Sequence, residues 1–296
     1  MKYAFFPGCV SKGACPELYQ SVMQVYPQIG IELEEMTSAS CTGAGVLQEK
    51  DRRLGDVLNA RTFALAEQQN LPIMTICSTC QGVMSQANHR MTTDEHYLAE
   101  INQVLGEEGL QYRGTTNIRH FVWILLEDVG EEELKRYIKR PLTGLRAAPF
   151  YGCYLQRPTE ALEFDDHPDR PKALERVIEI LGAEVVDFPG KSRCCGFPIL
   201  TINEPNSLTM VATHTTDAKA HGADIMVTPC PLCHLNLDGM QSKAANQQNT
   251  SIDLPILHLP QLLGLAMNMD PTSLGLNRNL VATEPVLQKI TSATLS

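Results

Sequence analysis

The chain is organised around Ser192-Arg193-Cys194-Cys195-Gly196-Phe197-Pro198, in which two adjacent cysteines precede a glycine. Phe150-Tyr151-Gly152-Cys153 lies upstream of this motif and Pro229-Cys230-Pro231-Leu232-Cys233 lies downstream. The three motifs supply five thiols in separated groups, which is too many for one disulfide. Structural zinc takes four ligands, and ordinary iron–sulfur clusters take four cysteines. Five thiols indicate a non-standard iron–sulfur cluster; the alternative is that one adjacent cysteine only packs as a buried hydrophobic residue.

The first half of the sequence repeats this arrangement. Phe6-Pro7-Gly8-Cys9, Ser40-Cys41-Thr42-Gly43 and Cys77-Ser78-Thr79-Cys80 follow one another in the same order as the three motifs of the second half. In both halves, 36 residues separate the first cysteine of the second motif from the first cysteine of the third. A repeat of this length is typical of two copies of one domain, because solenoid units are much shorter.

Apolar stretches and helical periodicity alternate within each half. The expected strands cover residues 3–6, 73–76, 147–151, 185–188 and 225–228, and the expected helices cover 58–69, 173–181 and 208–221, with further helices after Cys80 and Cys233. This alternation is typical of α/β domains, which carry their ligands on loops at the carboxyl ends of strands. The predicted fold is two tandem pseudo-symmetric α/β domains from an internal duplication, each with a cysteine cluster site on its loops.

The domain boundary is expected in Arg140-Pro141-Leu142-Thr143-Gly144-Leu145, where a proline and a glycine interrupt a helical pattern. This predicts an N-terminal domain over residues 1–142, with the altered motif Cys-Thr-Gly, and a C-terminal domain over 143–268. Residues 269–296 are polar with little periodicity. They are expected to form a tail that is disordered or becomes ordered on a partner.

The first half offers four thiols, and Thr42 stands where the repeat has its fifth cysteine. Four thiolates suit a second iron–sulfur cluster or structural zinc, and both remain open. Threonine is a poor ligand for either metal, so the two sites are expected to differ in chemistry. The four candidate metal ligands are Cys9, Cys41, Cys77 and Cys80. The Cys-x-x-Cys pairs alone are also typical of thioredoxin-like dithiols, an alternative that leaves the other cysteines unused.

Three further residues stand out in the repeat. His120 and His258 occupy equivalent places, each before an apolar helical stretch. Such a histidine caps or packs, but its repetition also marks both residues as candidates for proton transfer or substrate contact. Cys15 has no counterpart in the second half and is expected to be a buried or incidental thiol.

Composition and charge exclude several classes of function. The formal net charge of −10 argues against nucleic acid as a partner, because no basic excess is present to neutralise phosphates. The sequence contains no stretch of 18 apolar residues, so it predicts no transmembrane helix, and the N-terminus does not have the pattern of a signal peptide. We therefore expect a reducing cytoplasm, where cysteines serve as metal ligands or redox groups. No dinucleotide fingerprint or phosphate-binding loop is present, so a partner must supply the electrons.

With these motifs, the sequence resembles the Cys-Cys-Gly domain family, specifically the B subunit of heterodisulfide reductase. The family pattern is a cysteine, a Cys-Cys-Gly and a Cys-x-x-Cys, usually present twice. The second half matches it fully, and the first half matches it with Thr42 in place of one cysteine. The resemblance implies a non-cubane [4Fe-4S] cluster on the complete motif, with Cys194 and Cys195 also acting in catalysis. The implied ligands are Cys153, Cys194, Cys195, Cys230 and Cys233.

The resemblance also implies a function and partners. The first expectation is an oxidoreductase acting on sulfur groups: the iron–sulfur subunit of a heterodisulfide-reductase-like complex, which makes or breaks bonds in disulfides or protein-bound sulfur. The alternative is a cluster-bearing electron-relay and membrane-docking subunit of a type E succinate dehydrogenase. The implied partners are a ferredoxin-like iron–sulfur subunit, a flavoprotein subunit and, in relatives from sulfur oxidisers, a lipoate-carrying protein. The expected location is the cytoplasm, or the periphery of the membrane.

Overall fold

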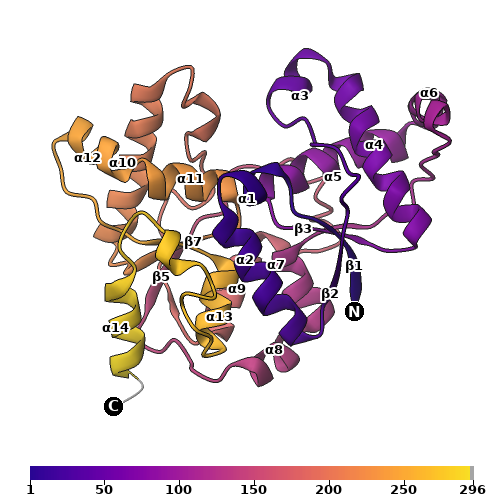
Figure 1. Cartoon of the computed structure of the whole chain (residues 1–296). Coiled ribbons are helices and arrows are strands. Elements are labelled where there is room, and N and C mark those ends of the chain that lie inside the picture. Colours follow the sequence, from indigo (N-terminus) through magenta and orange to yellow (C-terminus); the bar gives the residue numbers. More distant parts are fainter. Residues whose placement is uncertain (294–296) are drawn as a thin grey trace. The chain divides into compact units, whose positions relative to one another are not determined.

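Figure 1 shows the computed structural model, which describes residues 1–293. The chain forms two four-stranded sheets with the orders β2-β1-β3-β4 and β6-β5-β7-β8. Every strand pair in both sheets is parallel. The same order and the same pairing occur twice, so the predicted fold class of two pseudo-symmetric α/β domains from an internal duplication is confirmed.

The central strands of both sheets are almost entirely buried. This burial explains their continuous apolar sequences, because helices cover both faces of a parallel sheet. The strand expected at 185–188 is shorter in the structure, and beyond it the Val186 N–H still donates to the Ala147 carbonyl at 2.9 Å. The strands are β1 (Lys2–Phe6), β2 (Glu32–Glu35), β3 (Ile73–Thr75), β4 (Ile118–His120), β5 (Arg146–Pro149), β6 (Glu184–Val185), β7 (Ile225–Thr228) and β8 (Ile256–His258).

Helices connect the strands, and the longest of them begin at polar caps. The Asp51 side chain accepts from the Leu54 N–H at 3.0 Å, and Asn203 accepts from the Asn206 N–H at 3.2 Å. The helices are α1 (Cys9–Gly13), α2 (Pro16–Val25), α3 (Val46–Lys50), α4 (Arg52–Gln69), α5 (Ser78–Thr93), α6 (Glu95–Leu105), α7 (Phe121–Ile124), α8 (Glu131–Tyr137), α9 (Ala173–Ile180), α10 (Glu204–Ala220), α11 (Pro231–Gly239), α12 (Gln241–Gln248), α13 (Leu259–Ala266) and α14 (Glu284–Ala293).

The structure divides into two compact units that do not follow the order of the sequence. Unit 1, with the first sheet, consists of Met1–Cys9, Gly30–Phe121 and Tyr154–Pro171. Unit 2, with the second sheet, consists of Val10–Ile29, Val122–Cys153 and the chain from Lys172 onward. In each half, the segment that follows the first cysteine of the motif belongs to the unit built around the other sheet.

Unit 2 contains the C-terminal segment that the sequence singles out as a tail. Four of its apolar side chains are buried: Leu274, Leu276, Val286 and Ile290. The segment runs past the first turn of α2, where Gly275 has a φ of +74° and a Cβ would come within 2.8 Å of the Glu17 Cβ. Glycine is required there by both the backbone angle and the close approach. Residues 294–296 of this segment lie outside the described residues.

Asp238 in α11 forms hydrogen bonds to the same segment. Because this carboxyl is buried, we expect the stability of the fold to depend on pH. Its carboxylate accepts from the Leu280 and Val281 N–H groups at 2.6 and 3.2 Å. Burial raises the pKa of Asp238 to about 6; the two N–H groups oppose this shift, and the charge of Glu17 adds to it. A raised carboxyl pKa favours the protonated form in the folded state, so ionisation destabilises the fold as the pH rises towards and through 6.

We expect Asp238→Asn to remove this pH dependence. Relative to the wild type, the variant should gain roughly 2 kcal/mol of unfolding free energy between pH 4.5 and 7.5. Chemical denaturation of both proteins across that range measures the difference. The quantity to compare is the slope of the unfolding free energy against pH, because the asparagine amide offers the same single acceptor oxygen at every pH. Parallel pH profiles for the two proteins would contradict this account.

Candidate metal centres

The cysteines of the second half lie at one edge of the second sheet. Cys153 follows β5, and Cys194 and Cys195 lie in the loop after β6. Cys230 follows β7 as the N-cap residue of α11, and Cys233 lies in the first turn of that helix. Because all the strands are parallel, their carboxyl ends share an edge, which is where α/β proteins bind ligands.

The five thiols of this edge contact one another in a chain, which we call the five-thiol site. Hydrogen bonds link Cys153 to Cys194, Cys194 to Cys195, Cys195 to Cys233, and Cys233 to Cys230. Cys195, Cys230 and Cys233 are buried, whereas Cys153 and Cys194 are half-buried. The structure thus brings together all five residues that the sequence selects for this site.

Hydrogen bonding distributes the charge within the five-thiol site. Bonds from Cys153 and then Cys195 lower the pKa of Cys194, which makes it the thiolate of the group. The bond to Cys194 in turn raises the pKa of both Cys153 and Cys195. The Gly196 N–H also donates to the Cys194 sulfur at 3.4 Å. A thiolate is the form of cysteine that binds metals and attacks sulfur.

Glycine makes room for this packing of sulfurs. Gly152 has a φ of +72°, and a Cβ on it would lie 2.8 Å from the Cys233 sulfur. No real Cβ approaches an atom that closely, so the residue before Cys153 must lack a side chain. The glycine of the Cys-Cys-Gly motif, Gly196, has a φ of +91° and a Cβ position 3.0 Å from the Ser207 hydroxyl.

Polar side chains of α10 and α11 hold the Cys-Cys-Gly backbone in place. Asn236 donates to the Cys195 carbonyl at 2.7 Å and to the Ser207 hydroxyl at 3.1 Å, and Ser207 donates to the Gly196 carbonyl at 3.0 Å. A ring nitrogen of His214 lies 2.9 Å from the Cys194 carbonyl. Sequence reasoning missed these residues; the available signal was the short spacing from Cys233 to Asn236, which puts both on one face of α11.

The first half places its four cysteines in the same way. Cys9 begins α1 after β1, Cys41 lies in the loop after β2, and Cys77 caps α5, with Cys80 in its first turn. Cys9 and Cys41 are exposed and hydrogen-bonded to each other, whereas Cys77 and Cys80 are buried. Burial and the neighbouring Cys41 raise the pKa of Cys9. A Cβ on Gly8 would lie 3.3 Å from the Cys80 sulfur, so the glycine before the first cysteine has the same role in both halves.

Thr42 occupies the position of the missing fifth cysteine. Its hydroxyl donates to the Cys80 sulfur at 3.9 Å, which corresponds to the bond between Cys195 and Cys233 in the other half. Thr42 is buried, and its carbonyl accepts from the Asn59 side chain at 3.0 Å. The threonine therefore preserves the packing of the motif without supplying a thiolate.

The two histidines that the sequence singles out end equivalent strands, β4 and β8, and both are fully buried. His120 packs its ring against Phe121, with the ring centroids 4.6 Å apart. His258 instead joins a group with Cys15, Glu17 and His234, whose ligand atoms all lie within 4.8 Å of one another. Cys15 is buried, as expected for an unpaired thiol, and donates to the Pro231 carbonyl at 3.4 Å.

The spread of the thiols bears on which metal group suits them. In residues 1–293, that Cys-Glu-His-His group is the one set of three or more potential ligands that lie mutually within 4.8 Å. The five thiols contact one another in pairs. Five thiols exceed the four ligands that one zinc ion takes.

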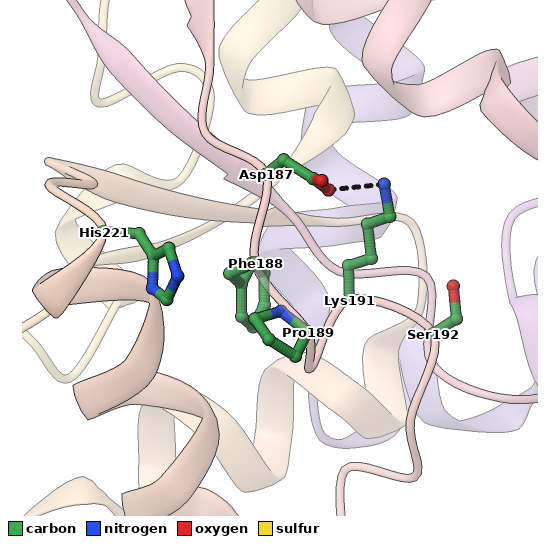
Figure 2. Close-up of a pocket in the computed structure, with 6 residues that line it drawn as sticks. All are labelled: Asp187, Phe188, Pro189, Lys191, Ser192 and His221. Carbon is green, nitrogen blue, oxygen red and sulfur yellow. Dashed lines mark hydrogen bonds and ion pairs between the residues drawn. The ribbon is translucent and has the colours of Figure 1, made fainter.

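A pocket of about 510 Å³ opens beside the segment that leads from β6 to the Cys-Cys-Gly motif (Figure 2). Lys191 forms ion pairs there with Asp187 at 2.6 Å and with Glu175 at 3.2 Å. None of the cysteines lines this pocket, so it is separate from the five-thiol site. Its lining residues are Asp187, Phe188, Pro189, Lys191, Ser192 and His221.

Comparison with known proteins identifies the family. Residues 3–85 and 147–238 match the cysteine-rich domain CCG. The 8-methylmenaquinol:fumarate reductase membrane anchor subunit of Wolinella succinogenes is 38% identical, over 95% of this chain and 97% of that protein. The B subunit of the ferredoxin:CoB-CoM heterodisulfide reductase of Methanosarcina mazei is 32% identical, over 98% of this chain and 97% of that protein. No helix within residues 1–293 combines the length and the apolar character needed to cross a membrane.

Two further similarities agree with this. A protein of Archaeoglobus profundus that is named as similar to the B subunit of heterodisulfide reductase is 32% identical over 92% of both chains. The crystal structure of a hypothetical protein from Helicobacter pylori superposes with a TM-score of 0.75 at 15% identity. The match covers 95% of this chain and 52% of the Helicobacter pylori chain, so this chain spans about half the length of that protein. At 15% identity, the likeness shows the fold alone. The chain belongs to the cysteine-rich CCG domain family, in the group that contains the B subunit of heterodisulfide reductase.

Proposed function

We propose that this protein is the iron–sulfur subunit of a heterodisulfide-reductase-like redox complex, in which it makes or breaks sulfur–sulfur bonds at a non-cubane [4Fe-4S] cluster. The observation that supports this most is the chain of five contacting thiols at the carboxyl edge of the second sheet. Relatives named as the B subunit of heterodisulfide reductases, with 30–32% identity over nearly the whole chain, support the same class of complex.

The proposed ligands of the cluster are Cys153, Cys194, Cys195, Cys230 and Cys233. When bound, such a cluster supplies single electrons and iron that accepts sulfur. The chain itself contributes a thiolate at the half-buried Cys194, next to buried thiols that water does not reach. Asn236 and Ser207 fix the carbonyls of Cys195 and Gly196, which orients the adjacent cysteines before any substrate arrives.

The four-cysteine site of unit 1 is proposed to hold a second iron–sulfur cluster or zinc. Because Thr42 keeps the fifth position filled without a thiolate, this site is proposed to relay electrons or to complete the substrate pocket. The proposed partners are a ferredoxin-like iron–sulfur subunit and a flavoprotein subunit, with a lipoate-carrying protein as a candidate sulfur carrier. The proposed location is the cytoplasm, where thiols remain reduced.

A second candidate is an electron-relay and membrane-docking subunit of a respiratory dehydrogenase, as in the type E succinate dehydrogenases. The observation that favours it is the 38% identity to a fumarate reductase membrane anchor subunit. In this case, the cysteine sites would pass electrons without a sulfur substrate, and the protein would attach to the periphery of the membrane.

The deciding experiment is metal and sulfide analysis of anaerobically purified protein, with paramagnetic resonance after oxidation in the presence and absence of candidate thiols. About four irons per chain would indicate one cluster, and about eight would indicate two. A paramagnetic signal that depends on the thiol supports sulfur chemistry. Reduction by a succinate-oxidising partner with no response to thiols supports the second candidate, and protein without iron would contradict both.

A further inference from the structure

Unit 2 contains a compact group of potential ligands outside the cysteine sites. Cys15 and Glu17 lie at the start of α2, His234 lies in α11, and His258 ends β8. The ligand atoms of all four lie within 4.8 Å of one another, and none of the residues is more than 5% exposed. The chain brings them together from positions more than 200 residues apart, and we call them the Cys-Glu-His-His group.

His258 indicates that something is missing from this group. Its side chain is fully buried, and neither ring nitrogen has a well-formed hydrogen bond. The Nε2 atom points to the Glu17 Oε1 at 3.5 Å, which is too long for a good hydrogen bond. Buried polar groups in proteins are nearly always satisfied, and one that is not destabilises the fold. A bound metal ion would provide the missing partner.

His234 is oriented as a metal ligand is. One of its ring nitrogens, Nε2, lies 3.0 Å from the Ile256 carbonyl, which can only accept a hydrogen bond. The side-chain nitrogen of Asn279 also lies 3.3 Å from Nε2, and the other ring nitrogen, Nδ1, lies 3.7 Å from Glu17 Oε1. Metal-binding histidines commonly have one ring nitrogen held by a backbone carbonyl, so that the other faces the ion.

The charges of the group suit a divalent ion. A carboxylate and a thiolate carry two negative charges, and two neutral imidazoles add none, so one divalent cation would leave the buried site neutral. Burial raises the pKa of Cys15, so this thiol would release its proton when the metal binds.

We propose that Cys15, Glu17, His234 and His258 bind one zinc ion in a closed structural site. One sulfur, one oxygen and two nitrogens form a tetrahedral donor set typical of zinc. All four positions are filled by the protein, and the close passage of Gly275 over Glu17 covers the site, so it offers no position for a substrate. The ion would fasten the start of α2 to α11 and β8, and none of its four ligands is among the proposed ligands of the cysteine sites.

X-ray absorption at the zinc edge tests the proposal on the intact wild-type chain. Every other proposed metal site in this protein contains only thiols, so scattering from histidine rings around zinc identifies this group. The expected spectrum has a first shell with mixed sulfur and nitrogen or oxygen, and about two imidazoles per zinc at this site. A spectrum with sulfur ligands alone, or protein without zinc, would overturn the proposal.

Two matched variants supply the second readout. His258→Gln is expected to lose one zinc per chain together with the imidazole scattering. His120→Gln, at the equivalent and equally buried strand end, is expected to keep both. Chelation should lower the melting temperature of the wild type and of His120→Gln by more than that of His258→Gln. Equal zinc content in the wild type and His258→Gln would overturn the assignment, and the absorption spectrum of the wild type decides it if the variant does not fold.

Discussion

Replacing Cys195 with alanine is expected to abolish turnover and to change the spectrum of the iron–sulfur centre. Cys195 is buried and links Cys194 to Cys233, so its loss breaks the chain of thiols at its centre. Changes in groups that only support a metal ligand already cost about 10–100-fold in affinity or activity, so loss of a ligand should cost more than roughly 100-fold. Turnover with a disulfide substrate and paramagnetic resonance of the purified complex measure the two effects.

The control for this variant is Thr42→Ala, which changes the corresponding position of unit 1. Thr42 contacts Cys80 as Cys195 contacts Cys233, but it brings no thiolate. The variant should therefore leave the spectrum of the five-thiol site as it is in the wild type. Wild-type activity and an unchanged spectrum in Cys195→Ala would remove this residue from the proposed centre.

Gly152→Ala is expected to empty the five-thiol site without changing any thiol. The new Cβ would lie 2.8 Å from the Cys233 sulfur, in a loop whose φ of +72° already disfavours a side chain. Overpacking of a buried site costs about 1–3 kcal/mol, which corresponds to a roughly ten- to hundredfold loss of metal affinity. Iron content and visible absorption of the anaerobically purified protein measure this loss.

Gly144→Ala is the control that distinguishes the clash with the Cys233 sulfur from the backbone strain of a side chain at positive φ. Gly144 has a φ of +81°, yet a Cβ on it would meet nothing within 4 Å. Both variants therefore carry similar strain in the backbone, and only Gly152→Ala pushes on a sulfur. If the two variants retain equal amounts of iron, the close contact between Gly152 and Cys233 has no part in binding the cofactor.

Much of the fold could be predicted because the two halves of the sequence repeat the same motifs and the same alternation of strands and helices. The central strands are continuous apolar runs, and the equal spacing between the second and third cysteine motifs relates the two halves. The edge strand β6 was harder to predict, since it has only two residues and Glu184 is exposed there. The composition of the two units could not be predicted, because no local pattern states which sheet a helix such as α2 packs on.

The candidate sites were predictable to different extents for a similar reason. Cysteines at fixed spacings are specific, so the structure brings together the thiols that the sequence selects. Asn236, Ser207 and His214 act on backbone carbonyls from neighbouring helices, and single polar residues in helices have no such spacing rule. Glu17 and His234 are far apart in the sequence and come together only in the folded chain, so no sequence pattern predicts their contact.

The C-terminal segment shows how few residues can anchor a polar stretch. Leu274, Leu276, Val286 and Ile290 are buried, but turns separate them and remove the periodicity that would reveal a packed helix. The acidic side chain of Asp238 adds two hydrogen bonds to the backbone of this segment. Interactions of this kind depend on partners distant in sequence and are invisible to a pattern search.

The exchange of segments between the two units has a consequence for the history of this fold. Val10–Ile29 completes the unit of the second sheet, and Tyr154–Pro171 completes the unit of the first. Both segments follow the first cysteine of their own half, so the exchange is reciprocal and obeys the internal symmetry. An ancestor of half this length would have lacked a piece of its own core as a monomer. Each unit would then have been completed only by a second copy of that half-length chain, and the present chain joins both copies in one polypeptide.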